Sequence, residues 1–364
     1  MNQPFAAASV LFLVYVSQCF GTAPLSCAVF LLNDRLKGRV LWRYWDTGPG
    51  GRRIFLLNPF LPHVGAVYAD RVPFAVRHGE GAEDIWLEAL SADGDKREAL
   101  TFPEAHNIFA LGKHVKVDGR KFVTMRSEAC AAATAEFLQR VRRTASVGRL
   151  ALLRENFRAR FRLKDLNERL ETYAKSSAYL QSVCFALFFF VFLLGPAALF
   201  FLGLHSTWFA LLLYLILSCA SITWFFAAAY RRIYPQKRGW PLQYMTTIAL
   251  SPFAAIRAND LLVAELLAEF HPVAVGRRLL EEEEFRRFAG SELRKARFLY
   301  RDDFLAGVLE EFLKQNGVDL ESLLGAPRRA DGASRTYCPV CLTQYVVESG
   351  NCKDCDETEL VRLG

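Results

Sequence analysis

The chain alternates between long apolar tracts and densely charged segments. No Asp, Glu, Lys or Arg occurs from Met1 to Leu32 or from Tyr179 to Tyr230. About 20 apolar residues span the hydrocarbon core of a membrane when they form a helix that rises about 1.5 Å per residue. In lipid each backbone amide must be satisfied within its own segment, so such tracts form helices. The pattern predicts three transmembrane helices, at residues 5–32, 180–202 and 207–230.

Basic residues border these tracts on one side. Arg35 and Lys37 follow the first tract, Lys175 precedes the second, and Arg231 and Arg232 follow the third. Because Lys and Arg concentrate on the cytosolic side of a membrane, all three borders are expected in the cytosol. The sequence therefore predicts an integral protein of a cytoplasmic-type membrane, with its N-terminus outside and its C-terminus cytosolic.

Two alternatives would change this topology. A cleaved signal peptide at residues 1–26 would place the C-terminal tail outside, but Met1-Asn2-Gln3-Pro4 lacks the basic residues that open a signal peptide. A fourth crossing by residues 242–256 would reverse the tail as well. That stretch is short, and Pro252 interrupts it.

A small α+β cytosolic domain is expected at residues 33–148. Asp118-Gly119 lies between two alternating runs and is typical of a tight β-hairpin. From Ser127 the apolar period becomes helical, which predicts a helix after the strands. Short apolar runs separated by turn residues predict further strands at residues 54–57, 66–68, 74–76, 85–89 and 108–111.

Residues 149–178 are interpreted as one basic amphipathic helix. Leu153, Phe157 and Leu166 recur at helical spacing, and Arg154 and Arg158 occupy other faces. Such a helix can contact anionic lipid, or it can run directly into the second transmembrane helix. It can equally pack on the neighbouring domain, and the pattern does not discriminate between these arrangements.

After the third tract, residues 240–324 are expected to be a cytosolic or interfacial helical region. The run Glu281–Glu284 stands next to basic residues, including Arg286 and Arg287, and opposite charges at i and i+4 support exposed helices. Residues 325–335 contain Gly325, Pro327 and Gly332 and are interpreted as a linker.

Four of the nine cysteines form two Cys-X-X-Cys pairs, Cys338 with Cys341 and Cys352 with Cys355. Each pair can form a turn that directs both sulfurs to one point, and two turns complete a tetrahedron for Zn²⁺ at about 2.3 Å. Residues 336–357 thus resemble a minimal four-cysteine zinc ribbon. Because all four corners are sulfur, no position is left for water or substrate, and the predicted zinc is structural. Iron in a rubredoxin-like site and two disulfides are the alternatives.

The remaining composition bears on function. The net charge is +7, but the basic excess lies between the apolar tracts and few basic residues surround the cysteines, so no nucleic-acid partner is expected. No Walker loop, Rossmann glycine fingerprint or Gly-X-Ser-X-Gly motif occurs, and no catalytic or cofactor-binding residue is assigned. The apolar tracts contain none of the charged groups that intramembrane chemistry and transport usually need.

The sequence therefore predicts an α-helical membrane protein with three transmembrane helices, a small α+β cytosolic domain and a C-terminal zinc ribbon. The leading expectation for its function is a membrane-anchored interaction or regulatory protein whose partners are the lipid bilayer and a protein. A membrane-embedded enzyme or assembly factor with an unrecognised site is the alternative.

Overall fold

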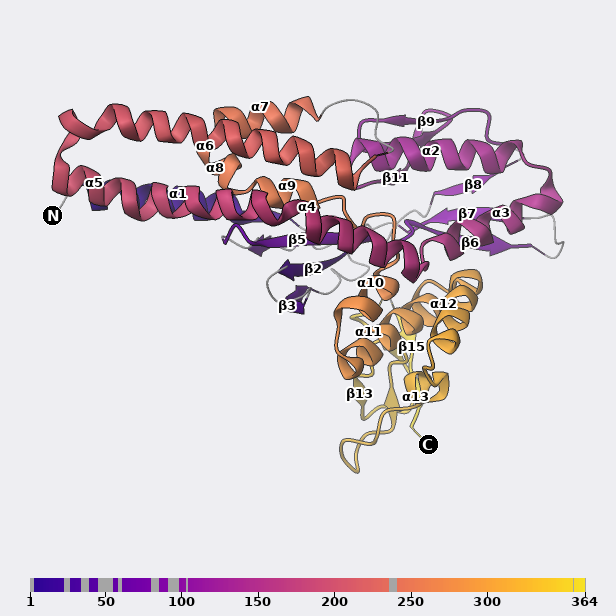
Figure 1. Ribbon diagram of the computed structural model, residues 1–364. Helices are drawn as coiled ribbons and strands as arrows, with labels where there is room; N and C mark the ends of the chain where they lie inside the picture. The colour runs from indigo at the N-terminus through magenta and orange to yellow at the C-terminus, as the bar shows by residue number, and fades with distance from the viewer. Residues whose placement is uncertain are drawn as a thin grey trace.

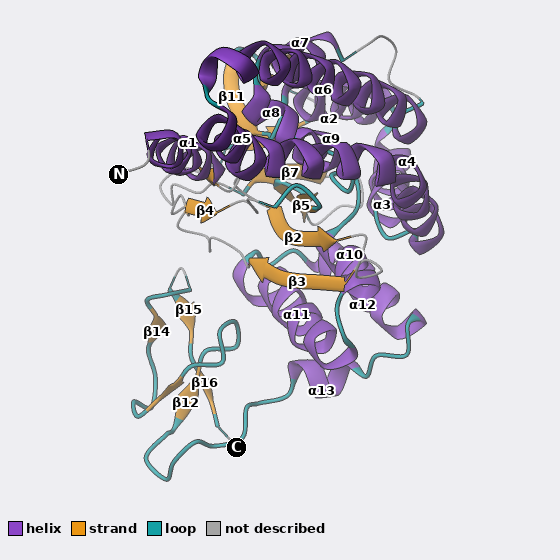
Figure 2. Cartoon of the chain, turned by 60° about the vertical axis from the view of Figure 1, so that its left-hand side comes forward, coloured by secondary structure: helices purple, strands orange, loops and turns teal. Residues whose placement is uncertain are grey.

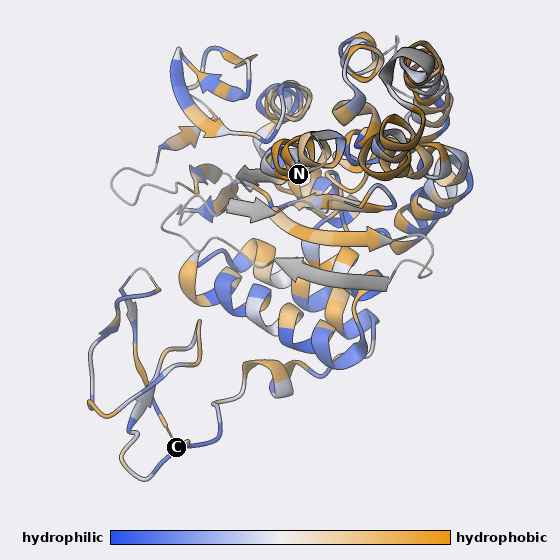
Figure 3. Cartoon of the chain, turned by 90° about the vertical axis from the view of Figure 1, so that its left-hand side faces the viewer, coloured by the Kyte–Doolittle hydropathy of each residue, from blue (hydrophilic) through white to orange (hydrophobic). Residues whose placement is uncertain are grey.

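The computed structural model describes residues 3–22, 27–33, 39–44, 55–57, 61–79, 85–90, 98–102, 104–235, 241–355 and 357–363. In Figure 1 the described chain forms a long helical bundle, a mixed α/β domain at one end and along one side of it, and a helical platform that carries a small β ribbon. Figure 3 looks onto the far end of the bundle and shows its helices as largely hydrophobic, whereas the platform helices below the sheet carry many hydrophilic residues.

Three apolar helices form the bundle. One contains 17 residues, α1 (Gln3–Cys19). The second is a continuous helical run of 40 residues, made of α4 (Leu163–Phe189), the π-helical turn η2 (Phe190–Leu194) and α5 (Gly195–Leu202). The third is α6 (Leu204–Ile233). Residues Leu163–Leu202 and Thr207–Ile233 form two helices that are long and apolar enough to cross a membrane.

Helix α1 runs antiparallel to the α4–α5 helix. Ring pairs lie along their contact, with Phe5 5.7 Å from Phe200, and Tyr15 6.0 Å from Phe188 between ring centroids. Tyr15 is fully buried. The start of α1 therefore lies at the end of the bundle where α5 turns into α6, which we call the tip. Helix α1 ends part-way along α4, and we call the opposite end of the bundle, where α4 begins and α6 ends, the base.

The prediction of one helix over residues 5–32 is wrong in its second half. Helix α1 ends at Cys19, and the Arg257 guanidinium donates a hydrogen bond of 2.6 Å to the Gln18 carbonyl in its last turn. Residues Cys27–Asn33 form strand β2, which pairs with strands on both sides. A buried strand is apolar on both faces, so its sequence does not differ in hydrophobic pattern from a short piece of apolar helix.

The α/β domain contains three three-stranded antiparallel sheets and one two-stranded pair. Their strand orders are β3-β2-β5, β6-β7-β8, β11-β10-β9 and β1-β4. The hairpin predicted at Asp118-Gly119 is confirmed as a two-residue turn, and both residues have the positive φ it requires, 49° and 83°. The strands are β1 (Phe20–Thr22), β2 (Cys27–Asn33), β3 (Arg39–Tyr44), β4 (Phe55–Leu57), β5 (Val64–Asp70), β6 (Phe74–His78), β7 (Ile85–Ala89), β8 (Ala99–Thr101), β9 (Ile108–Leu111), β10 (His114–Val117) and β11 (Arg120–Thr124).

The single amphipathic helix predicted at residues 149–178 is broken. Helix α2 (Glu128–Arg143), which begins after the Ser127 cap as expected, is followed by α3 (Ser146–Ala159), and α4 begins only at Leu163. Between α3 and α4, Arg160 donates hydrogen bonds to the carbonyls of Asp70 and Ala268, and Phe161 stacks on His271 at 4.7 Å. These long-range contacts turn the chain at a point where the helical pattern itself continues.

After α6 the chain folds back along the bundle. Helix α7 (Leu242–Leu250) packs beside α6, α8 (Pro252–Ile256) follows directly, and α9 (Ala258–Val263) lies between strand β5 and the bundle. No single helix spans residues 242–256, because α7 ends at Leu250 and α8 begins at Pro252.

Strand β5 and α9 meet at a glycine. A Cβ atom on Gly65 would lie 2.7 Å from the Cγ2 of Val263, a distance that buried side chains do not tolerate. We expect Gly65→Ala to destabilise the protein by about 1–3 kcal/mol by forcing α9 away from the sheet. The matched control is Gly307→Ala in α12, where a Cβ meets nothing within 4 Å. Thermal unfolding in detergent measures both, and equal midpoints would contradict the close packing.

The platform consists of short helices packed under the sheet. It contains α10 (Pro272–Leu279), α11 (Glu282–Arg294), the π-helical turn η3 (Lys295–Leu299), α12 (Asp303–Gln315) and α13 (Leu320–Leu324). A buried ion pair joins it to the α/β domain, with Arg71 Nε 2.7 Å from Glu292 Oε2. Asp302 also accepts a hydrogen bond from the Val76 amide at 3.2 Å. The platform is thereby fixed to the end of β5 and to β6.

The predicted linker, residues 325–335, connects the platform to the ribbon. Hydrogen bonds hold this linker against the ribbon. Gln344 donates to the Arg328 carbonyl at 2.8 Å and accepts from the Ala330 amide at 2.9 Å. The linker is therefore part of the ribbon's packing. The ribbon itself comprises β12 (Thr336–Tyr337), β13 (Gln344–Tyr345), β14 (Asn351–Cys352), β15 (Thr358–Glu359) and β16 (Val361–Arg362).

Candidate metal centre

The first Cys-X-X-Cys pair lies in the turn between β12 and β13. The Leu342 amide donates to the Cys338 carbonyl at 2.9 Å, and the Cys338 amide donates to the Thr343 carbonyl at 2.9 Å. Leu342 adopts a positive φ of 63°, which closes the turn directly after Cys341. This backbone geometry directs both sulfurs to the same side.

The second pair repeats the arrangement between β14 and β15. The Cys355 amide donates to the Cys352 carbonyl at 3.2 Å, and the Thr358 amide donates to the Cys355 carbonyl at 2.9 Å. Here Glu357 carries the positive φ, 54°. In Figure 2 the two short hairpins form a small unit of their own next to the platform helices.

The four sulfurs converge on one point. The Sγ atoms of Cys338, Cys341, Cys352 and Cys355 all lie within 4.8 Å of one another, and those of Cys341 and Cys352 are 3.8 Å apart. A tetrahedral ion with metal–sulfur bonds of about 2.3 Å has sulfur–sulfur edges of about 3.8 Å. All nine cysteines are free thiols, so no disulfide competes for these sulfurs. The cluster can therefore hold one metal ion, as the sequence predicted.

Metal binding at the cluster is coupled to the release of thiol protons. Burial raises the pKa of Cys338 to about 11 and raises the pKa of Cys355, whereas at Cys352 burial is outweighed by hydrogen bonds, from the Tyr345 hydroxyl among others, which lower the pKa. A metal ion must therefore displace the protons of the buried thiols when it binds them as thiolates. The Tyr345 hydroxyl donates to Cys352 Sγ at 3.2 Å, a contact that orients the ligand.

The ribbon is seated on the platform rather than hanging free. Arg294 of α11 donates to the Val340 carbonyl at 3.3 Å and to the Leu323 carbonyl at 2.7 Å. Leu299 of η3 shares a small apolar core with Val340 and Leu360 of the ribbon. The cluster is therefore joined to the α/β domain through helices, which fixes its position relative to the bundle.

The sequence identified the four ligands but not the residues that support them. Tyr345, Arg294 and Leu299 belong to no motif, and the last two lie far from the cysteines in the sequence. A short strand, β13 at Gln344–Tyr345, follows the first pair.

A second feature, a cleft of about 780 Å³, lies where α2, the start of α4 and the end of α6 meet. Asp70 in its wall is paired with Arg126 at 3.1 Å, and Arg169 is ion-paired with Glu269. The lining mixes both signs of charge, and its exposed members do not converge on one point. Its charged lining includes Arg160, Arg162, Asp165, Glu168, Arg169 and Arg232.

Comparison of the chain with protein-family models, with curated proteins and with solved structures gives no match. The functional argument therefore depends on the geometry of the described residues.

Proposed function

We propose that this protein is a membrane-anchored interaction or regulatory protein that presents a structural zinc ribbon on a fixed platform at the cytosolic face of the membrane. The observation that carries the proposal is the convergence of four cysteine sulfurs within 4.8 Å in a ribbon seated on the platform. Four thiolates fill a tetrahedral zinc site completely, so the metal has no open position for catalysis and serves the fold.

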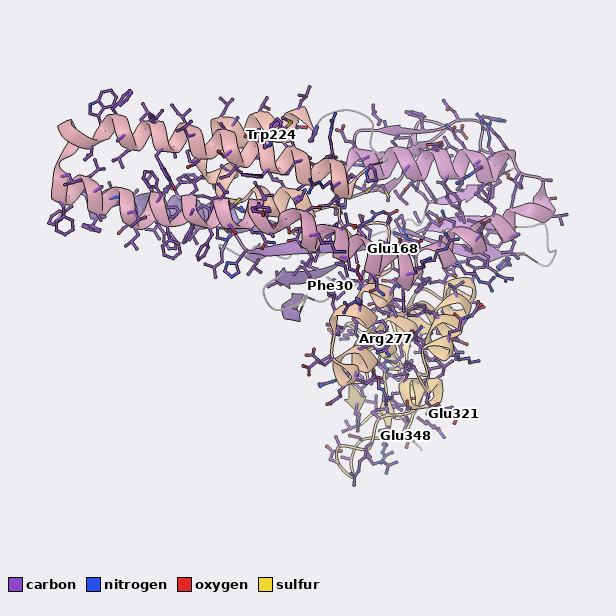
Figure 4. All side chains as sticks on the ribbon, viewed as in Figure 1. Phe30, Glu168, Trp224, Arg277, Glu321 and Glu348 are labelled. Atoms are coloured by element: carbon purple, nitrogen blue, oxygen red, sulfur yellow. The ribbon has the colours of Figure 1, made fainter. Side chains whose placement is uncertain are left out.

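The bundle supports membrane anchoring by three helices. Trp208 near the tip and Trp224 near the base are both exposed on α6, about 24 Å apart at about 1.5 Å per residue. Tyr179 on α4, also exposed, packs against Phe225 and so lies at the level of Trp224. Exposed Trp and Tyr at two levels are typical of the two interfaces of a bilayer. Figure 4 shows mostly carbon side chains along this arm and many nitrogen and oxygen atoms beyond it.

Orientation follows from the same helices. The start of α1 lies at the tip together with the α5–α6 turn, and Arg231 and Arg232 lie at the base. With the base in the cytosol, the N-terminal end of α1 faces outside, and the α/β domain, platform and ribbon are cytosolic. Burial of Tyr15 among Phe188, Phe192 and Phe253 supports retention of α1 in the mature protein over a cleaved signal peptide.

Contact with anionic lipid is assigned to the lower part of α4. Lys175 lies about one turn below Tyr179, is exposed and is ion-paired with Glu171 at 3.8 Å, and a lysine at this level supports contact with anionic head groups. Helix α3, the other half of the predicted basic helix, instead packs on the platform, where Phe157 lies 5.2 Å from Phe304.

Docking of a protein partner is assigned to the ribbon. The ribbon exposes three apolar side chains, those of Val346, Val347 and Val361. The edge strands of its three-stranded sheet are β13 and β16. Exposed apolar groups beside open strand edges are typical of interaction surfaces.

Affinity purification from mild detergent tests the proposed function. We expect a stoichiometric protein partner that is lost when Val346 and Val347 are replaced by Ser, a change that leaves the four cysteines in place. The control is Val147→Ser, because Val147 is an exposed valine on α3, outside the ribbon. Retention of the partner by the ribbon variant would contradict docking there. A copurifying small molecule, lost when the cleft residue Arg232 is replaced by Glu, would favour the alternative, a membrane-embedded enzyme or assembly factor.

A further inference from the structure

The fold-back helices α7 and α8 lie beside the part of the bundle that carries Trp224 and Tyr179, the exposed aromatic residues nearer the base. Tyr244 of α7 lies 6.2 Å from Phe226 of α6, between ring centroids, and so starts near the level of Trp224. Figure 1 shows α7 running from there along α6 toward the tip, and Figure 4 labels Trp224 at the level of α7.

The turn between α7 and α8 lies deeper than this level. Phe253, directly after the turn, is 5.9 Å from Tyr15 and 6.3 Å from Phe192, between ring centroids. Phe192 lies about 20 Å beyond Tyr179 along its helix, at about 1.5 Å per residue. The α7–α8 turn therefore lies closer to the tip than Trp224 and Tyr179 do. It lies beside the apolar part of the bundle.

From this turn the chain returns to the base. Cys184 Sγ donates to the Ala255 carbonyl at 3.3 Å, and Arg257 reaches the Gln18 carbonyl at the end of α1. Arg257 is also paired with Asp260 at 3.0 Å. This ion pair is the first charge after Arg238 in the sequence. It is largely buried beside the last turn of α1, on the base side of the α7–α8 turn.

The outward face of α7 is suited to lipid. Leu250 at its end is 85% exposed, and no charged residue occurs from Gly239 to Ile256. Thr246 and Thr247 donate their hydroxyl protons to carbonyls of the preceding turn, at 3.0 and 2.8 Å. Polar groups satisfied in this way can be placed in hydrocarbon without an unpaired donor.

Two backbone amides of the turn are satisfied as well. The Ser251 amide donates to the Thr247 carbonyl at 3.1 Å, and the Ser251 hydroxyl accepts from the Ala254 amide at 3.4 Å. Pro252 has no amide proton. Irregular backbone at membrane depth requires satisfaction of this kind, because lipid offers no hydrogen bonds.

We infer that α7 and α8 form a re-entrant hairpin that enters only the cytosolic leaflet, turns at Ser251-Pro252 and returns to the side from which it came. The 9 residues of α7 rise about 13 Å, about half the hydrocarbon thickness, which suits one leaflet and not a crossing. This inference rests on the proposed membrane anchoring. It keeps the platform and ribbon on the same side of the membrane as the α/β domain.

Photo-crosslinking to lipid tests the hairpin. The photoreactive residue p-benzoylphenylalanine replaces Leu250 in one variant of the full chain, reconstituted in vesicles of phosphatidylcholine with a minority of phosphatidylglycerol. The positive control carries it in place of Ile216, 56% exposed on α6 midway between Trp208 and Trp224, and the negative control in place of Leu111, 56% exposed in the α/β domain. All three sites are exposed, so the bulky group does not disturb a core.

We expect mass spectrometry to find acyl-chain adducts at position 250 as abundant as at position 216, and none at position 111. Acyl-chain adducts at 216 together with only head-group adducts, or none, at 250 would overturn the re-entrant hairpin and leave the membrane anchor intact. Absence of acyl-chain adducts at position 216 would show that the bundle is not in the bilayer, and both the anchoring and the hairpin would be wrong.

Discussion

We expect the double variant Cys338→Ser, Cys341→Ser to lose its bound metal, which we propose is zinc, and its folded ribbon. The ribbon's own apolar core is small, with Val340 and Leu360 as its main aliphatic members, and it depends on contact with Leu299 of the platform. Structural zinc sites contribute about 10–16 kcal/mol of apparent binding free energy at neutral pH, which exceeds what such a core supplies. We expect amide hydrogen exchange in β12 and β13 to rise to the rate of an unfolded peptide.

Metal analysis and hydrogen exchange measured on the same preparations distinguish zinc loss from general damage. The control is Cys130→Ser, which removes a partly exposed thiol of α2 and should keep one zinc per chain and a protected ribbon. Protection of β12 in the double variant without metal would mean that packing on the platform is sufficient. One iron per chain in place of zinc would refute the identity of the metal but not the site.

A single substitution in the buried ion pair, Glu292→Gln, will loosen the platform from the α/β domain. Glu292 accepts from Arg71 at 2.7 and 2.9 Å and from Lys295 at 3.1 Å, and all of these groups are largely buried. Removing one partner of a buried pair leaves the other charge uncompensated, which costs about 3–5 kcal/mol. Glu283→Gln, at an exposed pair with Arg287, is the control and should change stability by less than about 1 kcal/mol.

The pH dependence of this variant carries a defined sign. Burial alone would raise the pKa of Glu292, but Arg71 and Lys295 hold it below its ordinary value of 4.5. On acidification the carboxylate of Glu292 is therefore protonated at a higher pH in the unfolded chain than in the folded protein. The stabilisation by Glu292 is lost as the pH falls below about 4.5. The gap in unfolding midpoint between wild type and Glu292→Gln should be constant above that pH and should narrow below it. A gap that widens on acidification would contradict the assignment.

His271 adds a second acid-dependent contribution in both proteins. Burial lowers the pKa of His271 from 6.5 to about 3, so the folded protein keeps it neutral while the unfolded chain binds a proton below about pH 6.5. Wild-type stability should therefore begin to fall at a higher pH than the Glu292 contribution requires. Thermal unfolding in detergent between neutral pH and pH 4 measures both effects.

Local patterns determined those parts of the fold that local chemistry dictates. The Asp118-Gly119 hairpin follows from positive φ at two adjacent residues, and the start of α2 follows from the Ser127 cap, whose side chain accepts from the Cys130 amide. The α4–α5 and α6 helices follow from apolar tracts longer than any soluble strand. The four metal ligands follow from spacing alone, because a Cys-X-X-Cys turn directs its sulfurs without help from distant residues.

Tertiary contacts decided the elements whose sequence fits two structures. Residues Cys27–Asn33 are apolar up to Leu32, without alternation, and could continue a helix. Pairing with β5 makes them a strand, and Arg257 binds a carbonyl in the last turn of α1, which ends before them. The helical pattern around Arg160 continues through the residues where the chain turns, because that arginine bonds to carbonyls more than 80 residues away in the sequence. The hairpin of α7 and α8 likewise depends on packing against α1 and α4, since its own residues are too few to fix the position of the hairpin along the bundle. The hydrophobic pattern therefore determined which residues are shielded from water. Only packing between distant segments decided in which part of the structure each of them is shielded.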